Sequence, residues 1–487
     1  MSKVRKEETL DPENWDKFKA LGYRVLEDAL THLQNIRDYP NEHQPEEASP
    51  KLLVSLSEEG EGEEQVFNSV LENLIPYSVS NTRPQFWGFV AGTGSPYGVL
   101  VDTLISSRNA GKMYYGDLSI CKQAINWIKE LLEVPEEYTG VFVSGGSEAN
   151  YTGLAVARNA KAEVDMKTQG MQSVPRKMVL YGSEENHPCL ERSVELLGLG
   201  SNAIRRIPVD ALYRIKVDRL EKAIEEDKKQ GLHPFCVIGN AGTANTGSFD
   251  DLNTLADICQ REDLWFHIDG AFGAWVKLSE THKHLADGLE RGDSIAVDLH
   301  KWMNMQYPIG ITLVKDKVAH YSTFVYGHDA KYLDSVLSNV DLDVMTMFSS
   351  LALSRGNIGL KAYMLLRAFG KGKYRKLVQQ NIDGIHYLAD ILEKEPHFEV
   401  TVPAISNIVC FRYNPGGLSE EQIEKLNKMI LGKLWSEIWG YISDTTLNGR
   451  YMLRACNVNH RTKLGDFDAL VNKIKEIGEA IDVDNIT

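Results

Sequence analysis

The sequence lacks the long apolar segments that cross membranes. Among its 487 residues there is no apolar run of about 18 or more, whereas a spanning helix needs roughly 20. The opening stretch MSKVRKEETLDPENW also lacks the apolar core of a secretory signal. We therefore expect a soluble cytoplasmic protein with no membrane partner.

Cysteine is scarce and scattered. The six cysteines are Cys121, Cys189, Cys236, Cys259, Cys410 and Cys456. They form no CxxC pair, and no histidines join them at zinc-binding spacing. We therefore expect reduced thiols, with neither a disulfide framework nor a metal site.

Positive charge is in deficit. The chain carries 53 Lys and Arg against 68 Asp and Glu, which gives a formal net charge of -15. No basic stretch with interleaved aromatic residues offsets this charge locally, and a negative surface repels phosphate backbones. Nucleic acid is therefore not an expected partner.

The chain does contain short apolar runs that alternate with amphipathic segments. The runs lie at 141–143, 178–181, 236–238, 264–268, 294–297 and 311–314. Helical patterns at 218–230 and 250–263 stand between some of them. Strands that are apolar on both faces and separated by helices predict a mostly parallel sheet covered on each side, hence an α/β fold.

Two segments flank this α/β region. Residues 1–80 begin with a helical pattern and continue into acidic loops, whereas residues 366–487 have an α+β pattern. The latter consists of helices at 377–394 and 420–438, a strand at 407–413 and a hairpin with an Asn448-Gly449 turn. We therefore predict an N-terminal helical segment (1–80), a large α/β domain (81–365) and a small C-terminal domain (366–487).

A candidate phosphate site follows the first predicted strand. Residues 141–143 run into Ser144, Gly145, Gly146 and Ser147, and a helix begins there. Glycines allow close approach to the backbone, and the unpaired N–H groups of a helix start favour an anion. A plain tight turn has the same sequence, and no lysine follows at P-loop spacing.

Two further strands end in residues suited to a cofactor ring. Asp269 ends one strand and is followed by Gly270 and Ala271, while His300 and Lys301 follow another. Ligands of open α/β sheets lie at the carboxyl ends of strands. An aspartate there can hold a protonated pyridine nitrogen, although it can equally cap a turn. A lysine desolvated there can have its pKa lowered and can form a Schiff base, although most lysines are solvated surface residues.

A histidine stands at a fourth strand end. His187 precedes Pro188 where the strand at 178–181 gives way to a helix. The imidazole can lie flat on a cofactor ring, or it can simply begin the helix. A phosphate loop, a histidine, an aspartate and a lysine are thus expected along the same edge of the sheet.

In this order, the strings SGGSEAN, NHP, HIDGAFGAW and DSIAVDLHKWMN resemble the group II pyridoxal 5'-phosphate (PLP)-dependent decarboxylases. That family contains aromatic L-amino acid, tyrosine, histidine and glutamate decarboxylases. The likeness extends over most of the chain: NTRPQFWGFVAG resembles the family's pocket segment, ALSRG its arginine segment and YMLRACNVNHRT its C-terminal strand.

The resemblance assigns roles to individual residues. It implies that Lys301 carries PLP as a Schiff base and that Asp269 pairs with the pyridine nitrogen. His187 and Ala271 would face the two sides of the ring. The phosphate would contact Gly146, Ser147 and His300, and Thr243 would lie beside the ring. The catalytic set is thus Lys301, His187 and Asp269, with no metal.

The resemblance also implies fold type I, like aspartate aminotransferase, and a homodimer with shared active sites that the N-terminal helices embrace. The candidate substrate-pocket residues are Phe86, Trp87, Phe89, Met113 and Arg355. Phe86, Trp87 and Phe89, with Met113, Tyr114 and Tyr115 expected from the partner subunit, would make an apolar aromatic pocket. Such a pocket favours Tyr, Trp, Phe or Dopa as substrate, although aromatic residues in a core would look the same. Arg83, Arg108 and Lys112 leave an acidic amino acid open as an alternative.

One departure from the family pattern bears on the reaction. The family protonates its carbanion from a tyrosine on a loop, and no tyrosine lies between Tyr332 and Arg355; the expected position falls near Thr346. In related enzymes, replacing that tyrosine diverts the carbanion toward oxygen and gives an aldehyde, ammonia and peroxide. We expect decarboxylation to the amine and CO2, with an oxygen-consuming aldehyde synthase as the alternative.

Two readings from other classes are weaker. A nicotinamide-dependent oxidoreductase would share the α/β pattern, but no G-x-G-x-x-G opens the first strand-helix unit. A relative without catalytic activity, with or without PLP, would conserve the fold and would fail to act on any amino acid.

Overall fold

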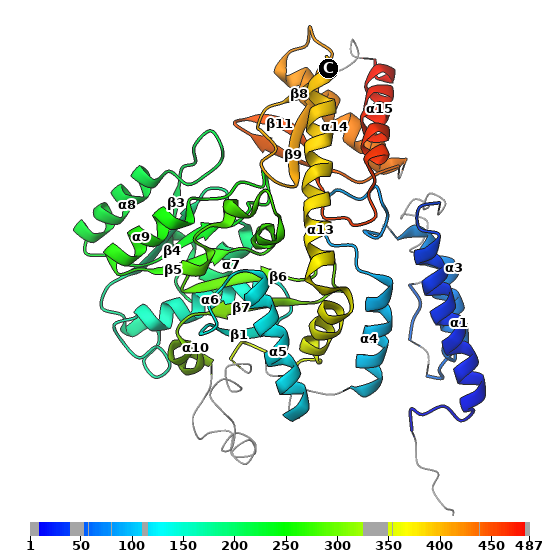
Figure 1. Cartoon of the computed structure of the whole chain (residues 1–487), viewed down its shortest axis with the longest axis horizontal. Coiled ribbons are helices and arrows are strands. Elements are labelled where there is room, and N and C mark those ends of the chain that lie inside the picture. The colour runs from blue at the N-terminus through cyan, green and yellow to red at the C-terminus, as the bar shows by residue number, and fades with distance from the viewer. Residues whose placement is uncertain are drawn as a thin grey trace, which may run out of the picture.

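The computed structural model describes residues 9–38, 53–56, 58–78, 80–109, 115–324, 349–352, 354–437 and 439–482. They form a large seven-stranded sheet and a small four-stranded sheet, and the long helix α13 (Ile358–Lys394) runs between the two (Figure 1). Helix α13 crosses the expected boundary at residue 366 and has non-helical backbone at Gly370. In the described part of the chain, no helix combines the length and apolarity needed to span a membrane.

The large sheet is mostly parallel, as predicted. Its strands are β1 (Thr139–Val143), β2 (Met178–Ser183), β3 (Ile204–Ile207), β4 (His233–Asn240), β5 (Trp265–Asp269), β6 (Ser294–Asp298) and β7 (Gly310–Val314). Their order is β1-β7-β6-β5-β4-β2-β3, and only β7 runs antiparallel to its neighbours. The carboxyl ends of β1, β2, β4, β5 and β6 therefore share one edge of the sheet.

Helices cover both faces of this sheet, which explains why its central strands are apolar throughout. Helices α6 (Gly146–Lys161) and α7 (Pro188–Leu196) lie on one side, and α8 (Val217–Lys229) and α9 (Leu252–Glu262) on the other (Figure 1). Strands β1, β2, β5, β6 and β7 are buried at every residue.

All six apolar runs singled out in the sequence form strands of this sheet. The remaining strand of the sheet, β3, was not predicted, because it is short and carries Arg205 and Arg206. It lies at the edge of the sheet, where one side needs no apolar partner. The antiparallel direction of β7 was also not predicted, because an apolar run has no orientation.

The N-terminal helices α1 (Trp15–Gln34) and α3 (Glu63–Asn73) stand beside the main body (Figure 1). No residue of α1 is buried, and Trp15, Phe18 and Tyr23 on it are exposed. Helices α4 (Pro96–Arg108), α5 (Tyr115–Leu131) and α10 (Lys317–Phe324) complete the larger part.

The small sheet has the order β10-β11-β9-β8. Its strands are β8 (Phe398–Val400), β9 (Ile408–Tyr413), β10 (Ser443–Leu447) and β11 (Arg450–Cys456), and helices α14 (Glu420–Ser436) and α15 (Leu464–Ala480) accompany them. The predicted hairpin joins β10 to β11, and its Asn448 and Gly449 both have positive φ.

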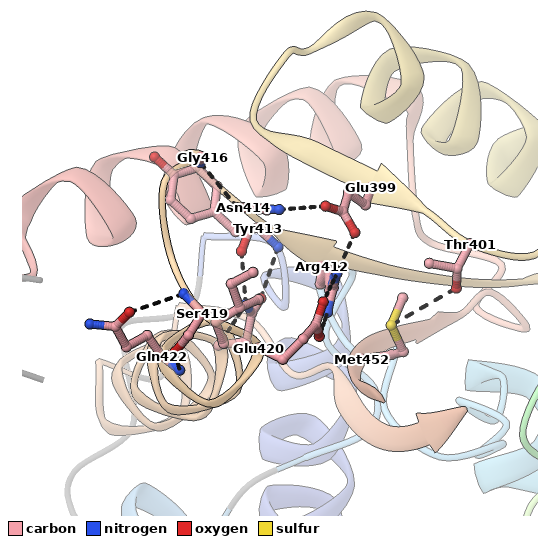
Figure 2. Close-up of polar contacts among 12 residues, drawn as sticks. Glu399, Thr401, Arg412, Tyr413, Asn414, Gly416, Ser419, Glu420, Gln422 and Met452 are labelled. Atoms are coloured by element: carbon pink, nitrogen blue, oxygen red, sulfur yellow. Dashed lines mark hydrogen bonds and ion pairs between the residues drawn. The ribbon is translucent and has the colours of Figure 1, made fainter. Parts of the chain in front are cut away.

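A buried arginine that pairs with two more exposed glutamates joins the elements of the small domain. Arg412 on β9 is only 3% exposed and reaches Glu399 Oε2 at 2.7 Å and Glu420 Oε2 at 2.6 Å (Figure 2). Ser419 and Gln422 form a capping box at the start of α14, which satisfies helix-start N–H groups. Strand and helix are thus tied together by charge as well as by apolar contacts.

Candidate active site

The predicted site residues converge at the shared carboxyl edge of the large sheet. Asp269, the last residue of β5, pairs with Ala296 on β6. A Cβ added to Gly146 would lie 2.7 Å from Asp298 Oδ2 and 3.2 Å from Ala271 Cβ. The turn after β1, the turn after β5 and the end of β6 therefore meet at one place, where the glycine leaves open space.

Lys301 extends from the end of β6 and is paired with a carboxylate. Its Nζ lies 2.9 Å from Asp298 Oδ2, and the lysine side chain is 23% exposed. Burial lowers the pKa of Lys301, but the Asp298 carboxylate outweighs burial and Asp269 adds to it, so the pKa is raised. Desolvation alone would lower the pKa of this lysine, but the turn after β6 brings the Asp298 carboxylate against the amine and reverses the direction.

Helix α6 begins at this edge with an open N-terminus. Its N-cap Gly145 offers no side chain, and the N–H and hydroxyl of Ser144 both donate to Glu148 Oε2 at 2.8 Å. The first-turn N–H groups at Gly146 and Ser147 have no partner within the helix and point their dipoles toward an anion. This cradle, the lysine and the strand-end aspartate match the phosphate, aldehyde and pyridine nitrogen of PLP.

Both predicted histidines of the site accept a backbone hydrogen bond at Nδ1. His187 is the N-cap of α7, and its Nδ1 accepts from the N–H of Cys189 at 3.2 Å, which places the ring proton on Nε2. Burial lowers the pKa of His187, and the Asp269 charge only partly opposes it. His300 accepts from the N–H of Ile309 at 3.3 Å, and burial lowers its pKa as well.

Asp269 and Thr243 are both buried near the strand ends. Asp269 is 7% exposed, and its Oδ1 accepts from the N–H of Ala271 at 3.1 Å, which fixes the carboxylate. Thr243, in the loop after β4, is 2% exposed and shares its hydroxyl with Thr246 at 3.0 Å. Its place beside a cofactor ring stays a prediction.

The segment 86–92 borders the site. Gly92 packs against the backbone carbonyls of His300 and Lys301, where no Cβ would fit. Phe89 has a positive φ of 53° and is 58% exposed, a strained conformation for a bulky residue and one that clusters at functional sites. Phe86 is buried and stacks on Tyr441 at 4.9 Å.

Two other predicted pocket residues have different positions. Trp87 is fully buried in the core of the small domain, where its Nε1 donates to Thr462 at 3.1 Å. It takes the core role that the sequence left open for these aromatic residues. Arg355 donates to the carbonyl of Phe142 on β1, next to the phosphate loop. Met113 lies outside the described residues.

Sequence reasoning missed Arg454. This residue of β11 is 4% exposed; its Nε donates to the carbonyl of Asn245 at 3.0 Å and its Nη1 to that of Phe89 at 2.9 Å. Its buried Nη2 has no hydrogen-bond partner among the described residues. Arg454 thus brings a cation between the Thr243 loop and the 86–92 segment. The segment YMLRACNVNHRT, which contains Arg454, was interpreted only as the family's C-terminal strand, with no role for the arginine.

Comparison with known proteins agrees with this geometry. Residues 45–414 match the model of the pyridoxal-dependent decarboxylase conserved domain. An aromatic-L-amino-acid decarboxylase of Bacillus atrophaeus is 31% identical over 475 residues, which cover 96% of this chain and 97% of the relative. A phenylacetaldehyde synthase of Arabidopsis thaliana is 24% identical, and the match covers 91% of this chain and 92% of the relative. A human cysteine sulfinic acid decarboxylase is 27% identical, and the match covers 90% of this chain and 90% of the relative.

The fold is shared with solved structures. The tryptophan decarboxylase (TDC) of Oryza sativa, solved with PLP and tryptamine, superposes with a TM-score of 0.88 at 22% identity and covers 97% of this chain and 99% of its own. This agreement confirms the predicted fold type I. The family match extends over both the phosphate loop and the lysine turn. The chain therefore belongs to the pyridoxal-dependent decarboxylases, and its cofactor is PLP.

Proposed function

We propose that this enzyme decarboxylates an aromatic L-amino acid to the corresponding amine and CO2. The single observation that carries the proposal is the meeting of Lys301, Asp269 and the open start of α6 at one sheet edge. The similarity to an aromatic-L-amino-acid decarboxylase along almost the whole chain supports the aromatic substrate.

Each residue of the site has a definite task in this proposal. Bound PLP supplies the sink for the electron pair that departing CO2 leaves behind. The N–H groups of Gly146 and Ser147 hold the phosphate, and the Lys301 amine holds the aldehyde carbon. The carboxylate of Asp269 keeps a proton on the pyridine nitrogen. Because Asp269 is fixed by the N–H of Ala271, the position of this charge is set before substrate arrives.

Among the described residues, Arg454 and His187 are the groups that we assign to the substrate end of the site. The unpartnered Nη2 of Arg454 can bind the substrate carboxylate, and the Nε2–H of His187 can donate to the same region. Holding the carboxylate fixes the torsion that selects loss of CO2 over loss of the α-proton. Phe86 and Phe89 provide the apolar surface for an aromatic side chain.

Two alternatives have specific support. The sequence between Tyr332 and Arg355 lacks a tyrosine, and a phenylacetaldehyde synthase is among the relatives, which favours an aldehyde-forming reaction as the second candidate. Residues 325–348 lie outside the described part of the chain. Cysteine sulfinic acid decarboxylase is also a relative, so an acidic substrate is the third candidate.

The proposed active form is a homodimer with shared active sites. Helix α1 has no buried residue in the single chain, and its aromatic side chains Trp15 and Phe18 are exposed next to each other at 6.1 Å. Large apolar side chains on one helix are stabilised when a second subunit covers them. Sedimentation of the holoenzyme at twice the chain mass tests this part of the proposal.

Products separate the candidates. The holoenzyme is incubated with each of the twenty amino acids and with Dopa, and CO2, amine, aldehyde and hydrogen peroxide are quantified. Amine and CO2 in equal amounts from an aromatic substrate support the proposal, whereas stoichiometric peroxide and aldehyde would establish the second candidate. Borohydride reduction followed by peptide mass spectrometry must place the cofactor on Lys301.

A further inference from the structure

A chain of buried hydrogen bonds runs beneath the proposed site. His267 lies on β5 two residues before Asp269 and is 0% exposed. Its Nδ1 lies 2.8 Å from the hydroxyl of Ser294, its register partner on β6, and its Nε2 lies 2.8 Å from Asn150 Oδ1 on α6. One imidazole therefore joins two strands of the sheet to the helix that begins at the phosphate loop.

The partners of His267 are consistent with one set of hydrogen-bond directions. Asn150 donates its Nδ2 hydrogen to Cys189 Sγ at 3.6 Å, so its Oδ1 accepts and His267 Nε2 carries a hydrogen. The indole of Trp265 can only donate, and it donates to Ser294 Oγ at 2.8 Å. The Ser294 hydroxyl is then free to donate to His267 Nδ1. A neutral imidazole with its proton on Nε2 satisfies all these groups.

Packing makes His267 a close fit. A Cβ added to Gly153 of α6 would lie 2.6 Å from His267 Cε1 and 3.1 Å from Ser294 Oγ. Helix α6 can therefore approach the sheet this closely only because residue 153 is a glycine. Burial also lowers the pKa of His267 to about 4, which agrees with the neutral form.

These hydrogen bonds lead from His267 to residues that we assign to cofactor binding. Cys189, which accepts from Asn150, is the residue whose N–H binds His187 Nδ1 at 3.2 Å. Burial raises the pKa of the Cys189 thiol to about 12, so the sulfur remains uncharged near Asp269 and Lys301. His267 on β5 is thus connected to β6 through Ser294, to α6 through Asn150 and, by way of Asn150, to Cys189 on α7.

We propose that His267 is a positioning residue that holds three cofactor-binding elements in one register. These elements are the strand end with Asp269, the helix start with Gly146 and Ser147, and the helix start with His187. The inference rests on the function proposed above for those residues. His267 transfers no proton in this role; it supplies one donor and one acceptor at fixed positions.

Two substitutions test this role. His267→Leu removes both hydrogen bonds and leaves buried polar partners unsatisfied, so we expect PLP to bind about tenfold or more weakly. We also expect the pH at which the visible band of the holoenzyme titrates to shift. His267→Gln offers one donor and one acceptor, and it should restore most of the PLP affinity and the wild-type titration. Dissociation constants come from spectral titration of the apoenzyme with PLP.

His320 provides the matched control. It is also 0% exposed, has a pKa lowered to about 4 by burial, and hydrogen-bonds through both nitrogens, to Thr139 Oγ1 and the carbonyl of Ser349 at 2.8 Å each. His320→Leu should lower the melting temperature of the apoenzyme as His267→Leu does, but leave PLP affinity within about twofold. If His267→Leu does not fold, Ser294→Ala removes the two hydrogen bonds that the Ser294 hydroxyl forms with His267 and Trp265, and it is expected to weaken PLP binding in the same direction.

Three results would overturn the inference. The first is an unchanged PLP affinity in His267→Leu or, if that variant does not fold, in Ser294→Ala. The second is a PLP affinity of His267→Gln no higher than that of His267→Leu. The third is a loss of PLP affinity in His320→Leu equal to that in His267→Leu. The proposed function fails separately, if borohydride leaves no label on Lys301 of the wild type or if no amino acid is consumed. PLP affinity can be compared among the variants in either case.

Discussion

Replacing Asp298 with asparagine should change the acid-base behaviour of Lys301. The wild-type pair has an Nζ–Oδ2 distance of 2.9 Å, and Asp298 is 1% exposed. At that separation the gross Coulomb attraction is about 6 kcal/mol with an effective dielectric constant of about 20. Asparagine keeps the size of the side chain and removes its charge. Burial then becomes the main influence and the pKa of Lys301 falls.

The pH dependence follows from the sign of the shift. In the wild type the pKa of Lys301 is raised above its ordinary value of about 10.4. The contribution of the pair to stability is therefore complete below about pH 10 and is lost as the pH rises through the raised pKa. Removing one partner of a buried pair costs about 3–5 kcal/mol at pH 7, and loss of the amine's proton reduces this cost.

Reconstitution of the apoenzyme with PLP gives the measurement. The unprotonated amine is the nucleophile, so the rate of covalent attachment in the wild type should keep rising to alkaline pH. In Asp298→Asn the rate should level off at a lower pH. Asp227→Asn is the control, because Asp227 on α8 is also buried, at 5% exposed, but pairs with Arg205 on β3 at 2.8 Å. Coincident profiles for wild type and Asp298→Asn would refute the reasoning.

Two further predictions concern the phosphate cradle and the substrate carboxylate. Gly146→Ala should weaken PLP binding by about tenfold or more, because the added Cβ would lie 2.7 Å from Asp298 Oδ2. Gly432→Ala on α14 is the control, because its added Cβ meets nothing within 4 Å. This control variant should raise the free energy of unfolding by up to about 1 kcal/mol. Equal PLP affinity in both variants, measured by spectral titration, would contradict the first. Arg454→Gln should lower kcat/KM for the amino acid by about thirtyfold or more while PLP stays bound, and an unchanged kcat/KM in steady-state assays would exclude Arg454 as the carboxylate ligand.

The edge of the site could be predicted because strand ends leave a local signal. Asp269 and Lys301 each follow a short apolar run, and parallel strands bring their carboxyl ends together. Contacts between distant segments leave no such signal. Asp298 was visible next to Lys301, but its effect on the lysine pKa depends on how the turn folds. Arg454 reaches the site from a different sheet, about 150 residues later in the chain.

The position of Trp87 bears on how this protein can be divided. The indole completes the hydrophobic centre of a domain whose remaining members come mostly from beyond residue 384. The backbone N–H of Trp87 also donates to the carbonyl of Tyr441, and the backbone carbonyl of Trp87 accepts from the N–H of Cys456. A fragment expressed from residue 366 onward would therefore contain an unfilled cavity where the indole belongs. Chimaeras that exchange this domain between relatives should carry residues 85–92 with it.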